Sequence, residues 1–92
     1  MPYITEEDRS KFDSPLDLLE GIVHQYGISN GELNYLMTKL GKLYMDRHGM
    51  SYNVGSDVIK AFECAKLEFY RRVMIPYEDR KIEQNGDVYE LV

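Results

Sequence analysis

Cysteine and tryptophan are nearly absent from this sequence, which has Cys64 as its one thiol and no tryptophan. A single cysteine excludes an intrachain disulfide and favours a reducing compartment, so we expect a cytoplasmic protein. Long hydrophobic runs are missing too, since none approaches the roughly 20 residues that a membrane helix needs. The acidic N-terminus carries no apolar segment of the signal-peptide kind. We therefore expect neither secretion nor membrane association.

Positive charge is also scarce. The chain has 11 basic and 16 acidic residues and a net charge of −5, which disfavours broad contact with nucleic acid or anionic lipid. The sequence contains no glycine-rich phosphate loop, no His-Glu-x-x-His and no Glu-x-x-His. It also lacks the Glu-x-x-Glu pair with which all-α nucleotide pyrophosphohydrolases hold magnesium. These absences favour a non-enzymatic protein and predict neither a metal nor a cofactor.

What the sequence does contain is helical periodicity, which predicts an all-α fold of three main helices after a short N-terminal turn. The first main helix is expected to begin at Ser14 and to end at Gly27. The second is expected to begin with the capping-box pattern of Ser29 and Glu32 and to end at His48. The third runs to Pro76, where a helix either kinks or restarts with the proline in its first turn. Three residues compete to cap this third helix: Ser51, Asn53 and Ser56.

The C-terminal segment admits two structures. The favoured one is a helix to about Gln84, followed by an extended tail. The alternative is a β-hairpin, because Asn85-Gly86 is a strong hairpin signal between residues 81–84 and 87–90, with Lys81 facing Glu90. An isolated hairpin is marginal in water and would have to pack on a helix or on a second subunit.

The whole chain, residues 1–92, is expected to form a single helical domain. Its 92 residues are 43% hydrophobic, which provides a core but a thin one. A domain of this size buries only about two-thirds of the surface of its unfolded chain. We therefore expect a homo-oligomer.

Two opposite charges, Glu63 and Lys66, fall on an apolar arc of the third helix if the helix is regular. They are three residues apart and can pair with each other. One interpretation is an ion pair that is buried or interfacial and sets the register between helices. A second is a pocket in which Lys66 meets an anionic ligand, and a third is the wet edge of a loosely packed face. The apolar residues of this arc are Val58, Ile59, Phe62, Phe69, Tyr70, Val73 and Met74.

Arg71 and Arg72 follow directly on the same helix, and their guanidinium groups suit phosphate or carboxylate recognition. The plainer interpretation is a solvated face balanced by acids such as Glu68 and Glu78. Tyr35 is predicted to share the outer face of the second helix with charged residues, where it could contact a partner or stack on a ligand. The candidate ligand-binding residues are therefore Lys66, Arg71, Arg72, Glu63, Tyr70 and Tyr35.

Five segments of the chain are notable as motifs: Gly31-Glu32-Leu33-Asn34-Tyr35, Glu63-Cys64-Ala65-Lys66-Leu67-Glu68-Phe69-Tyr70-Arg71-Arg72, Pro76-Tyr77-Glu78-Asp79, Lys81-Ile82-Glu83-Gln84-Asn85-Gly86-Asp87-Val88-Tyr89 and the opening Met1-Pro2-Tyr3-Ile4. They resemble a family of small uncharacterised proteins of bacteriophages, bacteria and archaea, known as a domain of unknown function. The resemblance implies a phage or prophage origin and carries no established activity with it. Phages also encode small helical oligomers that sequester nucleotide immune signals of the host, and this chain is similar to them in size, acidity and helical content.

Three functions remain open at this point. The first is a non-enzymatic, homo-oligomeric binding protein whose ligand is a phosphate-bearing, nucleotide-like signal or a host protein. The second is a metal-dependent phosphohydrolase that uses Glu63 and Glu68. The third is a nucleic-acid-binding regulator that places the side of the third helix from Lys60 to Arg72 on phosphates, which the net charge disfavours.

Overall fold

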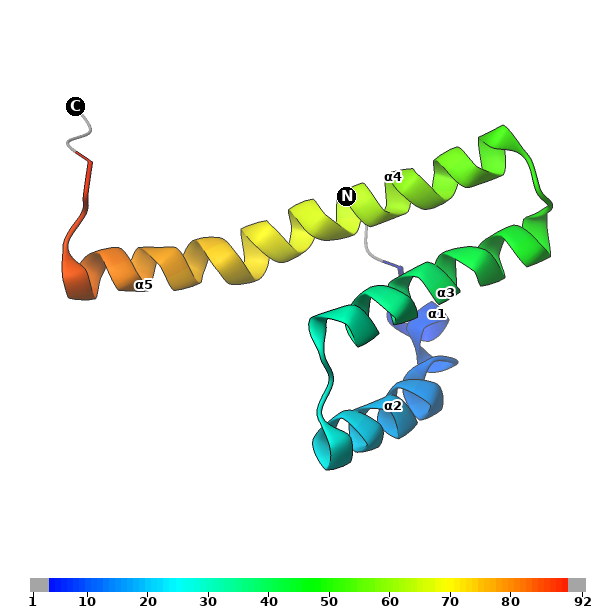
Figure 1. The fold of residues 1–92 in the computed structure, drawn as a ribbon, viewed down its shortest axis with the longest axis horizontal. Coiled ribbons are helices and arrows are strands. Elements are labelled where there is room, and N and C mark those ends of the chain that lie inside the picture. Colours follow the sequence, from blue (N-terminus) through cyan, green and yellow to red (C-terminus); the bar gives the residue numbers. More distant parts are fainter. Residues whose placement is uncertain (1–3, 90–92) are drawn as a thin grey trace. The chain divides into compact units, whose positions relative to one another are not determined.

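A computed structural model describes residues 4–89 and divides the chain into two units, Met1–Arg47 and His48–Val92. Residues 1–3, which belong to the opening motif, and residues 90–92 lie outside the described range. The described residues are mostly helical and contain no strand, which confirms the all-α prediction (Figure 1). Each unit is described by itself below.

The first unit begins with α1 (Glu6–Ser10), and Thr5 is its N-cap. The Thr5 hydroxyl accepts a 3.1 Å hydrogen bond from the backbone N–H of Asp8. α2 (Asp13–Tyr26) starts earlier than predicted: its N-cap is Phe12, which makes no side-chain cap bond, and the expected cap, Ser14, lies inside the helix. The reason is the turn that closes α1, because the Phe12 N–H binds the Arg9 carbonyl at 2.9 Å. This turn leaves Phe12 with helical dihedrals, so the chain never takes the extended conformation that a capping serine needs.

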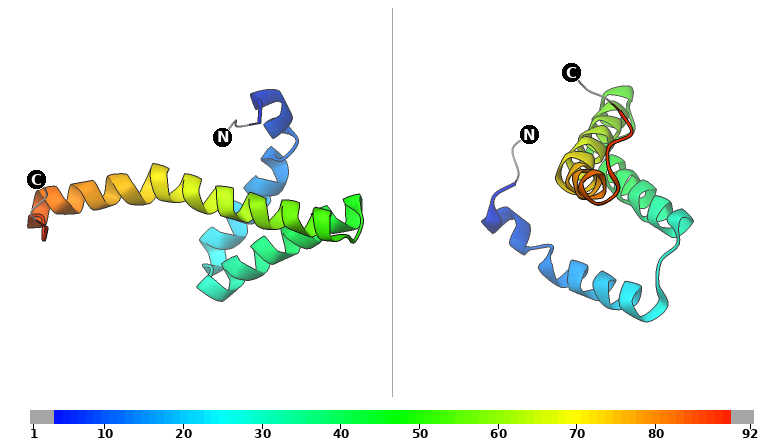
Figure 2. Two further views of the ribbon diagram at one scale, coloured as in Figure 1. Left: turned by 90° about the horizontal axis from the view of Figure 1, so that it is seen from above. Right: turned by 90° about the vertical axis from the view of Figure 1, so that its left-hand side faces the viewer.

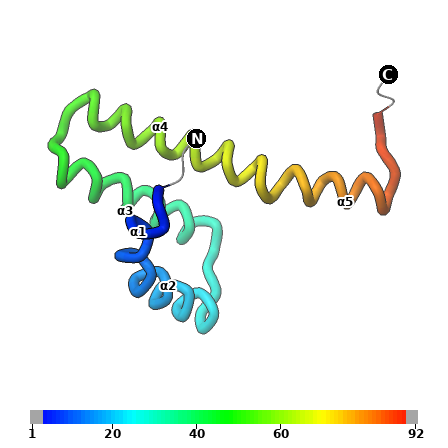
Figure 3. The backbone as a smooth tube through the Cα atoms, turned by 180° about the vertical axis from the view of Figure 1, so that it is seen from behind, coloured from blue at the N-terminus to red at the C-terminus, as the bar shows by residue number. Residues whose placement is uncertain are grey.

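The junction of α2 and α3 (Asn30–His48) has the helix end and the N-terminal cap that the sequence predicts (Figure 3). α2 ends at Gly27, which has a φ of 73° and donates its N–H to the Val23 carbonyl at 2.7 Å. The capping box of Ser29 and Glu32 is closed by two reciprocal bonds. The Ser29 N–H binds the Glu32 carboxylate at 2.9 Å, and the Glu32 N–H binds the Ser29 hydroxyl at 3.1 Å. α3 then ends at His48, as predicted.

The second unit is a nearly unbroken run of helix: α4 (Tyr52–Phe69), η1 (Tyr70–Met74) and α5 (Ile75–Asn85) follow one another end to end (Figure 2). Among the three competing caps, Ser51 is the one that acts. It is extended, with φ −149° and ψ 164°, and its hydroxyl accepts the Val54 N–H at 3.2 Å. Extended dihedrals and a bond to the third residue of the helix are the features of an N-cap.

Pro76 lies in the first turn of α5, so the helix restarts at the proline, which was one of the two predicted outcomes. The residues just before it form a π-helical turn, in which the Ile75 N–H binds the carbonyl of Tyr70, five residues back. A proline has no N–H to offer to the carbonyl four residues earlier, and its ring crowds that carbonyl. The wider turn accommodates both effects. It also holds about one extra residue, which rotates everything after it by about 100° relative to an unbroken α-helix.

α5 ends at Asn85, and Gly86 closes it with a φ of 84° and a 2.8 Å bond from its N–H to the Ile82 carbonyl. The favoured prediction of a helix followed by a tail is therefore confirmed, one residue longer than expected. The hairpin alternative is wrong for the described residues, because Asn85-Gly86 terminates a helix instead of joining two strands. Glu90, the expected partner of Lys81 in that hairpin, lies outside the described range.

Few side chains are shielded from solvent within the described residues. No hydrophobic residue among them is fully buried, and the one buried residue is Gly41 of α3. In the second unit, no described helix folds back on the line of α4, η1 and α5. The large apolar residues of these helices therefore stay accessible to a partner. The half-buried apolar side chains include Leu19, Val23, Leu36, Met45, Val54, Val58, Phe62 and Met74.

Candidate functional site

Glu63 and Lys66 form the predicted pair on α4, with 3.6 Å between the Glu63 Oε1 and the Lys66 Nζ. Their side chains are 57% and 70% exposed. The wide turn of η1 moves only the part of the predicted apolar arc that follows Phe69. Because η1 rotates the residues that follow, Val73 lies farther from Lys66 around the helix axis than regular α-periodicity predicts. An interfacial role for the pair stays a prediction.

Arg71 and Arg72 converge on one carboxylate, that of Glu68. The Arg71 Nη2 lies 3.0 and 3.2 Å from the two carboxylate oxygens, and the Arg72 Nη1 lies 3.7 Å from one of them. The Glu68 side chain is only 18% exposed, so the two arginines meet a partly shielded acid. The two guanidinium groups and the carboxylate thus form one ion-paired group on η1 and the end of α4.

Tyr70 is also engaged, because its hydroxyl donates to the Glu78 Oε1 at 3.2 Å. This bond connects η1 to the first turn of α5 across the wide turn. We use the name η1 cluster for Glu68, Tyr70, Arg71, Arg72 and Glu78. Three of the six predicted ligand residues, Tyr70, Arg71 and Arg72, thus lie in one short segment. They bond to Glu68 and Glu78, the two acids that were predicted to balance their charge.

Tyr35 belongs to the first unit and the other five predicted ligand residues to the second. Tyr35 was expected on the outer face of its helix, and it does remain exposed there. It also forms part of the wall of an apolar pocket of about 230 Å³. The periodicity of α3 alone did not reveal this pocket, because its other wall comes from α2. The lining residues are Leu19, Ile22, Val23, Gly27, Ile28, Glu32, Tyr35 and Leu36.

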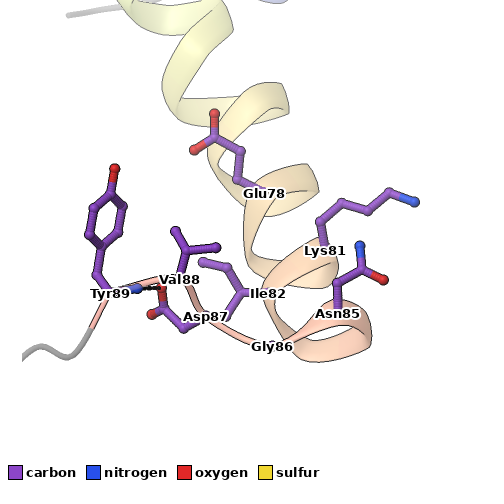
Figure 4. Close-up of a pocket in the computed structure, with 8 residues that line it drawn as sticks. All are labelled: Glu78, Lys81, Ile82, Asn85, Gly86, Asp87, Val88 and Tyr89. Carbon is purple, nitrogen blue, oxygen red and sulfur yellow. Dashed lines mark hydrogen bonds between the residues drawn. The ribbon is translucent and has the colours of Figure 1, made fainter.

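A second, more open pocket of about 350 Å³ lies where the tail leaves α5 (Figure 4). Glu78, Lys81 and Ile82 line it from the helix, and Val88 and Tyr89 line it from the tail. The Tyr89 N–H binds the Asp87 carboxylate at 3.0 Å, which keeps the tail turned at this point. In the sequence, only the Asn85-Gly86 dipeptide indicated a change of direction here, and it was compatible with either a helix end or a hairpin turn.

The described residues offer little for metal or nucleophilic chemistry. No group of three or more histidine, cysteine or acidic side chains among them is placed to hold a metal ion. Glu63 and Glu68, the acids of the hydrolase hypothesis, are each paired with cations. Cys64 is a half-buried free thiol. No helix within residues 4–89 is long and apolar enough to span a membrane.

These features define a small all-α protein with an arginine–glutamate cluster at a wide helical turn. The chain belongs to the family described as a domain of unknown function, DUF6899, whose model matches residues 1–88. The match confirms the resemblance noted in the sequence. No curated protein and no solved structure matches the chain.

Proposed function

We propose that this protein is a non-catalytic binding protein that acts through the exposed faces of its helices. The observation that carries the proposal is the exposure of large apolar residues along α4, where the Ile59, Leu67 and Phe69 side chains are all more than half exposed. Exposed apolar surface of this kind marks interaction sites. A helix in water also gains most of its stability from packing one face against a partner. The proposal includes self-association into a homo-oligomer.

The ligand we propose is a phosphate-bearing small molecule that is bound at the η1 cluster. Arg71 and Arg72 supply the forked donors that phosphate oxygens prefer, and both lie beside the Glu68 carboxylate in one short segment. Tyr70 offers a ring for stacking, and Lys66, oriented by Glu63, adds a further cation on the preceding helix. The idea that the ligand is a nucleotide-like signal rests only on the likeness of this chain to small helical phage proteins in size, acidity and helical content. A phage origin rests only on the family resemblance. A host protein is the other candidate ligand.

Native mass spectrometry of protein purified gently from cells tests the proposal. It measures the number of subunits and any small molecule that is retained. We expect a defined oligomer that carries extra mass, and the mass identifies the class of the ligand. A bare monomer that captures neither a small molecule nor a protein would contradict the proposal.

Substitutions in the η1 cluster test the site itself. We expect Arg71→Ala/Arg72→Ala to weaken anion binding roughly tenfold or more, because hydrogen bonds to charged groups contribute about 1.5–3 kcal/mol each. Glu68→Gln removes the competing carboxylate and should strengthen binding. Calorimetric titration with the retained molecule, or with inorganic pyrophosphate if none is retained, measures both effects.

The matched control is Lys39→Ala/Lys42→Ala, which removes the same charge from α3, where Lys42 pairs with Asp46. Circular dichroism establishes that each variant keeps its helix content. Equal affinity of the arginine variant and the wild type would remove the η1 cluster from the proposal, whatever the ligand.

The two other hypotheses have less support. A hydrolase that uses Glu63 and Glu68 would have to release both acids from their cations to bind a metal. It predicts turnover of nucleotides with Mg²⁺ or Mn²⁺. A nucleic-acid regulator predicts binding that weakens as salt rises, because phosphate contacts release counterions.

A further inference from the structure

The pocket beside Tyr35 lies at the junction of α2 and α3, and all of its lining belongs to the first unit (Figure 3). Both of its walls therefore come from one unit. Leu19, Val23 and Leu36 line it as half-buried side chains. Ile22 and Tyr35 are 55% and 63% exposed. An apolar hollow whose walls stay partly in solvent is typical of an interaction site.

The volume of the pocket, about 230 Å³, indicates the size of the group that fills it. Dedicated small-molecule sites occupy roughly 300–1,000 Å³, and a dry cavity of about 150 Å³ holds a benzene ring. The pocket thus has room for one large side chain and not for a whole nucleotide. Insertion of apolar side chains from an amphipathic helix into a groove is a recurring mode of protein recognition.

Glu32 is the only charged residue in the lining, so the pocket has a negative charge at one point of its wall. The carboxylate accepts the Ser29 N–H at 2.9 Å, and no basic side chain within residues 4–89 pairs with it. The positive end of the α3 dipole amounts to only about half a unit charge, so the full charge of Glu32 outweighs it. A complementary partner therefore carries a positive charge beside its apolar group.

The charge of the wider surroundings has the same sign. α2 contains three acids, Asp13, Asp17 and Glu20, and neither lysine nor arginine. The net charge of the whole chain is −5. None of the three acids lines the pocket, so their effect is the long-range attraction of a positive partner and not direct contact.

Tyr35 can contact both parts of such a partner. Its exposed ring offers flat apolar area next to the pocket, and the face of an aromatic ring attracts the cation of a lysine or arginine. Tyrosine is also one of the side chains that are enriched in protein interfaces and in their energetic centres. The ring and the Glu32 carboxylate together favour a basic, apolar partner.

We propose that the pocket beside Tyr35 binds a basic amphipathic segment of a partner protein. One large apolar side chain of the segment fills the space lined by Leu19, Val23 and Leu36. A lysine or arginine about one helical turn away on the segment meets the Glu32 carboxylate. The inference rests on the proposed binding function and names the chemistry of its protein partner.

Two synthetic peptides, added to the full-length protein, test the charge of the partner. One is an amphipathic helix of about 14 residues, roughly four turns, with leucine and lysine at helical spacing. The other has glutamate in place of every lysine. We expect the lysine peptide to bind at least about tenfold more tightly in calorimetric titration at neutral pH, because only its charge is complementary.

An acidic protein attracts any basic peptide, so variants have to locate the contact. We expect Glu32→Gln to weaken binding of the lysine peptide about two- to fivefold, the range for one exposed ion pair. Glu20→Gln removes the same charge from α2 outside the lining and should leave the affinity nearly unchanged. Ser29→Ala weakens the capping box but keeps the Glu32 carboxylate, so it should bind like the wild type. Circular dichroism establishes that each variant keeps its helix content.

Ile22→Ser tests the apolar wall. We expect it to weaken binding about fivefold or more, because apolar area that the peptide would cover is lost. Leu18→Ser is the matched control, since Leu18 is 74% exposed on the same helix and does not line the pocket. It should bind like the wild type.

Two results would overturn the inference. One is that neither peptide binds, which would mean that the pocket receives no such segment. The other is binding of the lysine peptide that neither Glu32→Gln nor Ile22→Ser weakens, which would place the contact on another acidic face. The proposed function survives both results if protein purified from cells retains a ligand or a partner. A bare monomer that also binds no peptide would contradict the inference and the function together.

Discussion

At the scale of single residues, the chain is organised by side chains that bond to their near neighbours along one helix. Glu32 is the clearest example, because it closes the capping box with Ser29 at the start of α3. The Ser29 backbone N–H, and then its hydroxyl, lower the pKa of the Glu32 carboxyl below its usual value of 4.5. Both groups donate hydrogen bonds that favour the charged form.

This shift predicts a pH dependence. A depressed folded-state pKa means that the contribution of Glu32 to stability is fully present above pH 4.5 and is lost as the pH falls through the folded value. Glu32→Gln keeps an acceptor oxygen and does not titrate. We expect the wild type to be the more stable of the two near neutral pH, and the difference between them to vanish in acid.

Urea unfolding followed by circular dichroism at several pH values measures the effect. Glu20→Gln on the exposed side of α2 is the matched control, because it removes one carboxylate that takes no part in capping a helix. A difference between wild type and Glu32→Gln that stays constant across the acid range would contradict the prediction.

At the scale of elements, Pro76 determines the course of the long helix. Its missing N–H is accommodated by the π-helical turn of η1 rather than by a break, so α4 and α5 stay in one line. The extra residue of that turn decides which side chains align with Phe69 farther along. Regular periodicity placed Lys66 near the middle of an apolar arc, and the wide turn moved Val73 away from it.

Replacing the proline should therefore change the geometry more than the stability. In Pro76→Ala, residue 76 can donate to the Arg72 carbonyl, and we expect residues 70–74 to return to α-helical bonding with α5 rotated by about 100°. The added hydrogen bond is worth about 1 kcal/mol. The greater freedom of the unfolded chain offsets a similar amount, so the net change in stability should stay within about 1 kcal/mol.

Backbone chemical shifts and amide exchange of Arg71 to Tyr77 report this change directly. Pro15→Ala, in the first turn of α2, is the control and should leave residues 70–74 unaltered. Retention of the bond from the Ile75 N–H to the Tyr70 carbonyl in Pro76→Ala would show that something other than the proline causes the wide turn.

At the scale of the whole molecule, the main feature is apolar surface that the described residues leave exposed. The second unit consists of one line of helix and a short tail, and such an element has no core of its own. Its stability has to come from other packed surfaces, because isolated helices are marginal in water. Association and folding should therefore be coupled in this protein.

The coupling predicts a melting temperature that depends on protein concentration. For an associating chain of this size, we expect a rise on the order of 3–5 °C for each tenfold increase in concentration. Thermal melts across two orders of magnitude in concentration measure it. A wild-type midpoint that does not move would contradict the coupling.

The sequence by itself determined the features that arise from interactions within about five residues. The capping box of Ser29 and Glu32, the helix ends at Gly27 and His48, and the pairing of Glu63 with Lys66 all follow from local bonding rules. Local rules left two conformations open for Asn85-Gly86, because the same dipeptide can end a helix or turn a hairpin.

Other features became visible only in three dimensions. The pocket beside Tyr35 needs walls from both α2 and α3, and the shielding of Glu68 by Arg71 and Arg72 depends on the geometry of η1. Periodicity could not foresee either, because it assumes a regular helix and treats each helix separately. The exposure of Glu63 and Lys66 likewise depends on the phase of the helix and on its neighbours, and one-dimensional spacing contains neither.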